Sequence, residues 1–266
     1  MTDQKPHLPP EIDTTVAHSA RVWNYWLGGK ENFAADQVAG DAYRERYPLI
    51  GTFARESRDF LRRTVTYLAR DARVDQFLDL GAGLPTVNNT HEVAQRINPA
   101  ARIVYVDHDP LVLLHVHALL TSTPEGATDY VQADMRDTDV VLDGAAATLD
   151  LTRPVALVIS DVLGHIVDWD EALSLVRRLT DRLPSGSYLA LSHSTAGDDA
   201  HRAVQEEYNK SGAIPYIFRE PEVTVAFFEG LEMVEPGMVS WPNWRPDANT
   251  GTTTERAGWG AVARIP

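Results

Sequence analysis

The sequence predicts a doubly wound α/β fold, in which helices cover both faces of a sheet. The first observation is a short apolar run, 76–80, that ends at a turn containing Gly81 and Gly83. Glycine lets a backbone come very close to a ligand, because a β-carbon would occupy that space. A strand, a glycine-rich turn and a helix in this order are typical of the nucleotide-binding start of such a fold.

Two further observations support this fold class. Strand-like runs alternate with helical patterns, which favours a parallel sheet with helical crossovers. The last two runs have no helix between them and predict an antiparallel hairpin at one sheet edge. The expected strands are 76–80, 102–106, 129–132, 155–160, 187–192, 231–234 and 259–264, and the expected helices after the first strand are 88–97, 110–119, 170–183, 198–210 and 221–229.

The region before the first strand has helical patterns only, over 18–27, 31–46 and 52–69, after a polar, proline-rich arm. We expect an N-terminal arm and helical lid in residues 1–70 and a Rossmann-like domain in residues 71–266. Three aromatic residues crowd the first helix and either cover the site as a lid or simply dock the helix on the domain. These residues are Trp23, Tyr25 and Trp26, with Asn24 among them.

Composition limits the class of protein. The 266 residues are 44% hydrophobic and include no cysteine, which rules out disulfides and thiolate metal ligands, and we expect no metal site. No apolar run approaches the roughly 20 residues that span a bilayer, and the polar N-terminus has no signal core. We therefore expect a cytoplasmic protein. The net charge of −14 makes nucleic acid an unlikely partner, because nucleic-acid affinity depends largely on Lys and Arg.

Acidic residues recur at nearly equal intervals near the ends of the first three strands, at Asp79, Asp107 and Asp134. In a doubly wound sheet, ligands bind outside the carboxyl ends of the strands. Asp107 fits a carboxylate that accepts hydrogen bonds from ribose hydroxyls, the alternative being a helix cap. Asp134 and the adjacent Met135 fit an adenine site, the alternative being a capping aspartate before a core methionine. Position 86 is threonine, where the dinucleotide fingerprint requires glycine, which argues against a nicotinamide oxidoreductase.

The order of these motifs resembles that of class I S-adenosylmethionine-dependent methyltransferases over residues 70–266. The motifs are DLGAG at 79–83, VDHDP at 106–110, QADMRD at 132–137, ISDVLGHI at 159–166 and LPSGSYLALSH at 183–193. The segment ARVWNYWLGGKENF at 20–33 resembles the start of an actinobacterial methyltransferase family of largely unassigned substrate. The resemblance implies a doubly wound, seven-stranded mixed sheet with an antiparallel last strand, and S-adenosylmethionine as cofactor.

The resemblance also implies roles for individual residues. Gly81 and Gly83 would approach the methionyl part of the cofactor, Asp107 the ribose, and Asp134 with Met135 the adenine. The predicted cofactor set also includes Thr86, His108, Asp161, Asn24 and Tyr25. Thr86 and the backbone at the start of the next helix could meet the methionyl carboxylate, or Asn88 and Asn89 could merely cap that helix. Asp161 could meet the methionyl amine or the acceptor.

Two histidines are candidate general bases for methyl transfer. His165 follows the fourth strand and His193 follows the fifth, although a histidine after a strand is as often a helix cap or a rim residue. No motif at 160–165 specifies an acceptor class. We predict methyl transfer to a small molecule. The alternative is a cofactor-binding protein without transferase activity. Trp241 and Trp244 in the long segment 235–257 could line an acceptor pocket or pack within their own loop.

Overall fold

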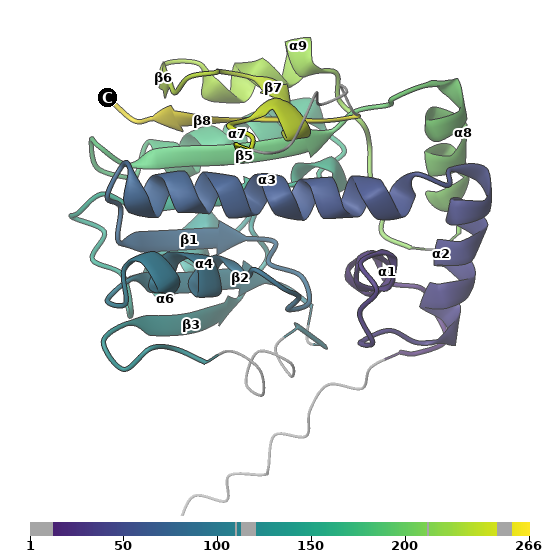
Figure 1. Ribbon diagram of the computed structural model, residues 1–266, viewed down its shortest axis with the longest axis horizontal. Coiled ribbons are helices and arrows are strands. Elements are labelled where there is room, and N and C mark those ends of the chain that lie inside the picture. The colour runs from purple at the N-terminus through teal and green to yellow at the C-terminus, as the bar shows by residue number, and fades with distance from the viewer. Residues whose placement is uncertain (1–12, 110, 113–120, 212, 249–256) are drawn as a thin grey trace, which may run out of the picture.

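A central sheet with helices on both faces forms the body of the protein (Figure 1). The computed structural model describes residues 13–109, 111–112, 121–211, 213–248 and 257–266. Its sheet order is β3-β2-β1-β4-β5-β8-β6, with β7 paired to β8. The strands are β1 (Gln76–Leu80), β2 (Arg102–Asp107), β3 (Ala127–Gln132), β4 (Ala156–Ser160), β5 (Tyr188–Ser194), β6 (Glu232–Met233), β7 (Val239–Ser240) and β8 (Gly258–Arg264).

The pairing confirms the predicted mixed sheet. Strands β1 to β5 pair in parallel, whereas β8 lies antiparallel between β5 and β6. The predicted terminal hairpin is present, with Glu232 opposite Arg264. The described residues contain one strand more than predicted, because β7 in the connecting segment pairs with β8 through Val239 and Gly260. All five residues of β1 are buried, as expected for a central parallel strand that is covered on both faces.

The described α-helices are α1 (Ser19–Trp26), α2 (Ala34–Arg46), α3 (Ile50–Arg70), α4 (Thr90–Ile97), α6 (Thr138–Ala145), α7 (Trp169–Thr180), α8 (Asp199–Tyr208) and α9 (Pro221–Thr224). Helix α6 was not predicted, and the predicted helix 221–229 is α9 followed by the 3₁₀ turn η2 (Val225–Phe228). The predicted helix 110–119 lies outside the described residues apart from 111–112. No helix in the described part of the chain is both long and apolar enough to cross a membrane.

Successive strand residues point to opposite faces of the sheet, and each face has its own core. Phe77 belongs to the core that α3 and α4 cover, and Leu78 to the core that α6 and α7 cover. Helix α3 therefore shares a core with the sheet, through Phe60 and Val65. The division of the chain at residue 70 stays a prediction.

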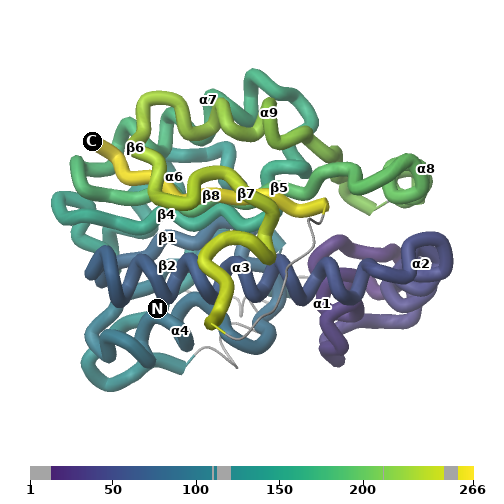
Figure 2. The backbone as a smooth tube through the Cα atoms, turned by 45° about the horizontal axis from the view of Figure 1, so that its top comes forward, coloured from purple at the N-terminus to yellow at the C-terminus, as the bar shows by residue number. Residues whose placement is uncertain are grey.

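Helices α1, α2 and α8 lie beyond the carboxyl ends of the parallel strands (Figures 1 and 2). A buried ion pair fixes α1 to α2, because Nε of Arg21 lies 3.0 Å from the Asp36 carboxylate. Tyr43 on α2 donates to Gln205 on α8 at 2.9 Å. The three helices are thus held together at the end of the sheet where a doubly wound fold binds ligands.

Candidate functional site

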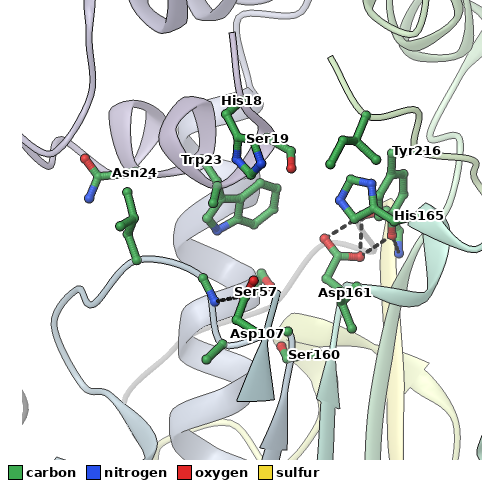
Figure 3. Close-up of a pocket in the computed structure, with 18 of the residues that line it drawn as sticks. His18, Ser19, Trp23, Asn24, Ser57, Asp107, Ser160, Asp161, His165 and Tyr216 are labelled. Carbon is green, nitrogen blue, oxygen red and sulfur yellow. Dashed lines mark hydrogen bonds between the residues drawn. The ribbon is translucent and has the colours of Figure 1, made fainter. Parts of the chain in front are cut away.

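One pocket of about 300 Å³ lies between the carboxyl ends of the strands and the helices beyond them. Its floor comes from the residues that follow β1, β2, β3 and β4, and its roof from α1, α2, α3, α8 and the segment 214–218. In Figure 3, His18 and Trp23 of the roof lie on one side, and Asp161, His165 and Tyr216 on the other. The predicted residues that line it are Asn24, Gly81, Gly83, Thr86, Asp107, His108, Asp134, Met135, Asp161 and His165.

The turn after β1 contains two glycines, and each is needed for a different physical reason. Both have positive φ, +69° at Gly81 and +60° at Gly83, which favours glycine. A β-carbon on Gly81 would lie 2.4 Å from the Val162 side chain, so this glycine is required by packing within the protein. A β-carbon on Gly83 would meet nothing within 4 Å. Since Gly83 lines the pocket, this open space is available to a ligand.

Asp107 joins the glycine turn to the loop after β2. Its Oδ2 accepts a hydrogen bond from the Gly83 backbone N–H at 2.8 Å, and its Oδ1 accepts one from Asp109 at 3.0 Å. Each carboxylate oxygen can accept a second bond. Asp134, in the neighbouring loop after β3, accepts from the backbone N–H and the guanidinium of Arg136, both at 2.9 Å. The two carboxylates thus lie fixed along one side of the pocket.

Two buried polar groups of the pocket have no hydrogen-bond partner among the described residues: Nε of Arg58 on α3 and the hydroxyl of Thr86 in the turn after β1. Both residues line the pocket. Burial lowers the pKa of Arg58, although the nearby Asp79 carboxylate opposes that effect. Asp79 itself accepts from Thr90 at 2.6 Å, and burial raises its pKa to about 6. Two unpaired donors in a buried place are costly unless a ligand satisfies them.

The residues around Thr86 also support the capping alternative for the start of α4. Asn89 accepts from the Thr86 backbone N–H at 3.0 Å, and Glu92 accepts from the Asn89 N–H at 2.9 Å. These bonds cap the helix without using the Thr86 hydroxyl. The sequence pattern did not single out Arg58, because it lies in a run of mixed charges. The spacing of residues did indicate that Arg58 faces the core. It lies four residues after the buried Ala54 and three before the buried Leu61, on the apolar stripe of α3.

Asp161, which follows β4, is a buried carboxyl group with a raised pKa. Its backbone has a φ of +55°, which is uncommon for a residue other than glycine. The Ser194 hydroxyl donates to both carboxylate oxygens, at 2.7 and 2.9 Å, and the Tyr216 hydroxyl donates to one of them at 2.6 Å. Burial raises the pKa of Asp161 to about 7, against the opposing effect of these hydrogen bonds. The group can therefore gain or lose a proton near neutral pH.

His165 lies close to Asp161, in the 3₁₀ turn η1 (Leu163–His165). Its Nδ1 lies 2.9 Å from the carbonyl oxygen of Pro215, so Nδ1 carries the proton and Nε2 is the acceptor nitrogen. Its ring meets the Tyr216 ring edge to face, with centroids 5.1 Å apart. Burial lowers the pKa of His165, which keeps the ring neutral at pH 7.

Two predicted residues do not line the pocket. His193 is fully buried, and its Nε2 lies 3.0 Å from the Arg219 guanidinium. Burial lowers its pKa to about 3, with Arg219 acting in the same direction. The structure therefore does not support His193 as a base that touches an acceptor. Tyr25 points elsewhere, because its hydroxyl donates to the exposed Asp41 at 2.8 Å and the Arg44 guanidinium lies over its ring.

Asn24 lines the pocket, but its amide already has structural partners. Its Oδ1 accepts from the Glu31 backbone N–H at 3.1 Å and from the Asn32 amide at 3.0 Å. Asn24 therefore holds the turn that follows α1, in addition to any contact with a ligand. Trp241 and Trp244 are fully buried against α3, where Arg63 donates to both of their carbonyl oxygens. They do not line the pocket, and their packing against α3 matches neither the expected acceptor pocket nor a loop that packs only on itself.

Comparisons with known proteins agree with this geometry. Residues 5–266 match the profile of a family described as S-adenosyl methyltransferase. A DUF574 family protein from Streptomyces avermitilis MA-4680 is similar, at 46% identity and a TM-score of 0.92 over 96% of this chain and 100% of that chain. A candidate methyltransferase from Thermobifida fusca YX is also similar, at 36% identity and a TM-score of 0.86 over 98% of this chain and 99% of that chain. No curated protein matches.

The family match covers nearly the whole chain, including the helices of the roof as well as the sheet. The two similar structures likewise extend over almost the full length of this protein. The chain therefore belongs to the S-adenosyl methyltransferase family, whose cofactor is S-adenosylmethionine.

Proposed function

We propose that the protein transfers a methyl group from S-adenosylmethionine to a small-molecule acceptor in this pocket. The observation that carries the proposal is that one pocket unites the Gly81–Gly83 turn, Asp107 and Asp134 with the titratable groups of Asp161 and His165. The first set has the chemistry to hold an adenosyl group, and the second lies where an acceptor can lose a proton. The net charge of −14 favours a small acceptor over nucleic acid.

The unpaired polar groups of Arg58 and Thr86 fit the cofactor. Arg58 and Thr86 present buried donors that suit its carboxylate, and the open space at Gly83 allows a close approach of the backbone. Asp107 would accept from the ribose hydroxyls and Asp134 from the adenine amino group. When bound, the cofactor supplies a methyl group on a positively charged sulfur, ready for in-line displacement. The protein then mainly has to align the acceptor, exclude water and receive a proton.

His165 is the residue that we propose as proton acceptor. Its proton on Nδ1 is held by the Pro215 carbonyl, so the neutral ring offers Nε2 to the hydroxyl or amino group of an acceptor. Asp161 lies beside it and can receive the methionyl ammonium group of the cofactor. The hydrogen bonds from Ser194 and Tyr216 fix the direction in which its carboxylate points.

Calorimetry with S-adenosylhomocysteine tests the cofactor site. We expect one site per chain, and Asp107→Ala should weaken binding by about 1–3 kcal/mol, because it removes charge-assisted hydrogen bonds. Asp139→Ala is the control, since Asp139 is exposed and pairs with Arg182 outside the pocket. Equal affinity of Asp107→Ala and the parent protein would refute the ribose assignment.

Transfer is tested by following S-adenosylhomocysteine release with a panel of small hydroxyl and amine acceptors. Once an acceptor is found, His165→Gln should lower kcat and leave the affinity for S-adenosylhomocysteine unchanged. Cofactor binding without product from any acceptor in a broad panel would instead favour the alternative, a binding protein without transferase activity.

A further inference from the structure

The roof of the pocket is aromatic, and its rings form a continuous wall. Each ring contacts the next, with centroid separations of 6.3, 5.6, 4.6, 6.1 and 5.1 Å along the series. In order, the rings belong to Trp23, Phe53, His201, Phe218, Tyr216 and His165, and all six residues line the pocket. The wall begins on α1 and ends where the roof meets the floor, at His165, the proposed proton acceptor. Aromatic walls of this kind favour flat, apolar ligands, which can stack on the rings or meet their edges.

The polar groups at the far end of the roof are already paired with each other. Gln205 accepts from the Tyr43 hydroxyl at 2.9 Å and donates to Asn209 at 2.9 Å. Burial lowers the pKa of His201 to about 4, so its ring is neutral at pH 7. This end therefore presents a largely apolar surface. Hydrogen bonding with a ligand is concentrated at the other end, at Asp161 and His165.

The charged side chains of the pocket also limit the charge that an acceptor can carry. Among the described residues that line the pocket, the lysine and arginine side chains are Arg58 and Arg136. Arg58 donates to the Asn88 carbonyl oxygen and Arg136 to Asp134, so both lie beside the proposed cofactor groups. The aromatic side instead borders the Asp161 carboxyl group. Among the described residues, a negatively charged acceptor would find no lysine or arginine on this side to offset its loss of hydration.

We propose that the methyl acceptor is a planar aromatic molecule without negative charge, carrying a hydroxyl or amino group on the edge that faces Asp161 and His165. This inference rests on the proposed function, because it assumes that the floor holds the cofactor. The ring system lies along the aromatic wall, and the reacting group lies next to Nε2 of His165.

Binding of three probes to the full-length chain saturated with S-adenosylhomocysteine tests this inference. The probes are 2-naphthol, the anionic 2-naphthoate and the non-planar decahydro-2-naphthol, each measured by calorimetry at pH 7.5. We expect 2-naphthol to bind at least about tenfold more tightly than either of the others. Comparable affinity for 2-naphthoate or for decahydro-2-naphthol, or no binding of 2-naphthol, would overturn the proposed acceptor class.

Two substitutions locate the probe. Ile214→Trp fills the roof beside the aromatic wall and should abolish 2-naphthol binding, whereas Val223→Trp adds the same bulk on exposed α9 and should leave it unchanged. Phe218→Leu removes one ring of the wall and should weaken binding about two- to tenfold. Unchanged 2-naphthol affinity in both roof variants would contradict the assigned location.

The affinity for S-adenosylhomocysteine, measured without a probe, separates the two proposals. It should be unchanged in Ile214→Trp and Phe218→Leu, which also shows that the variants fold. Failure of the parent chain to bind S-adenosylhomocysteine would overturn the proposed function. Normal binding of S-adenosylhomocysteine together with failure to bind 2-naphthol would overturn only the acceptor class.

Discussion

The floor and the roof of the pocket are built in different ways. The floor consists of turns that directly follow β1, β2, β3 and β4, so its residues come at regular intervals along the chain. The roof combines side chains from α1, α2 and α3 with side chains from α8 and the segment 214–218, which come much later in the sequence and meet the first three helices only through tertiary packing. The floor is polar and carries carboxylates, whereas the roof is aromatic. This difference fits the proposed function, in which the floor holds the cofactor and the roof contacts the acceptor.

A substitution in the glycine turn should have the largest effect and should act on the floor alone. Gly83→Val places a side chain in the open space of the pocket, and we expect the affinity for S-adenosylhomocysteine to fall by at least about 100-fold, or about 3 kcal/mol. Gly230→Val is the matched control. Gly230 also has a positive φ, +82°, with open space at its β-carbon, but lies in an exposed turn outside the pocket.

Both variants carry the same backbone strain, because valine at positive φ is unfavourable. Thermal unfolding should therefore show destabilisation in both, while calorimetry should show lost binding in Gly83→Val only. Equal losses of affinity in the two variants would mean that strain, and not contact with the cofactor, explains the glycine at 83.

Arg58 tests whether the floor extends to α3. Arg58→Met should weaken S-adenosylhomocysteine binding by about tenfold, at the lower end of the roughly 1.5–3 kcal/mol that a hydrogen bond to a charged group contributes. Binding of 5′-methylthioadenosine, which has no carboxylate, should not change. Arg55→Met is the control on the same helix, since Arg55 is exposed and donates to Thr52. Equal weakening of both ligands by Arg58→Met would contradict a carboxylate site.

The sequence predicted the floor well, for a physical reason. Parallel strands place their carboxyl ends along one edge, so the spacing of Asp107 and Asp134 is enough to predict that they lie together. The same reasoning predicted the order of strands and helices, apart from α6 and the short β7. Strand spacing could not predict that Arg58 lines the pocket, because its direction depends on how α3 is oriented against the sheet.

The roof was much less predictable. The contacts of Tyr43 with Gln205, or of Phe53 with His201, join segments more than 100 residues apart, and neither residue type signals its partner. The same limit explains why the sequence did not show that His193 and Tyr25 lie outside the pocket lining. A histidine at the end of a strand can face the pocket or the interior, and at His193 the buried Arg219 lies on the interior side. On α1, Trp23 and Tyr25 point in different directions, which the aromatic pattern alone did not resolve.

Asp161 lies where the floor meets the roof, and its titration should be visible in the stability of the cofactor-free protein. Burial raises the pKa of Asp161 in the folded state to about 7, from the ordinary aspartate value of 3.8. The folded state therefore keeps a proton that the unfolded chain has lost, so this residue's contribution to stability falls as pH rises from about 4 to about 7. Asp161→Asn removes that dependence.

The measurement is the melting temperature of both proteins at pH 5 and pH 8. From pH 5 to pH 8, the melting temperature of the parent protein should shift downward by about 5 °C relative to that of Asp161→Asn. Asp79, whose pKa is raised to about 6 by burial, acts in the same direction in both proteins and cancels in the comparison. An identical decrease in the two proteins would show that Asp161 is not the group whose proton affinity changes on folding.

The smallest effect should come from Tyr25, and it separates the inner from the outer side of α1. Tyr25→Phe removes only a hydroxyl that bonds to the exposed Asp41, so its affinities for S-adenosylhomocysteine and 2-naphthol should stay within about twofold of the parent values. Trp23→Leu, two residues earlier, removes a ring that lines the pocket and should weaken the binding of 2-naphthol. A loss of 2-naphthol affinity in Tyr25→Phe as large as that in Trp23→Leu would mean that the outer side of α1 also contributes to the binding site, which would contradict the proposed roof.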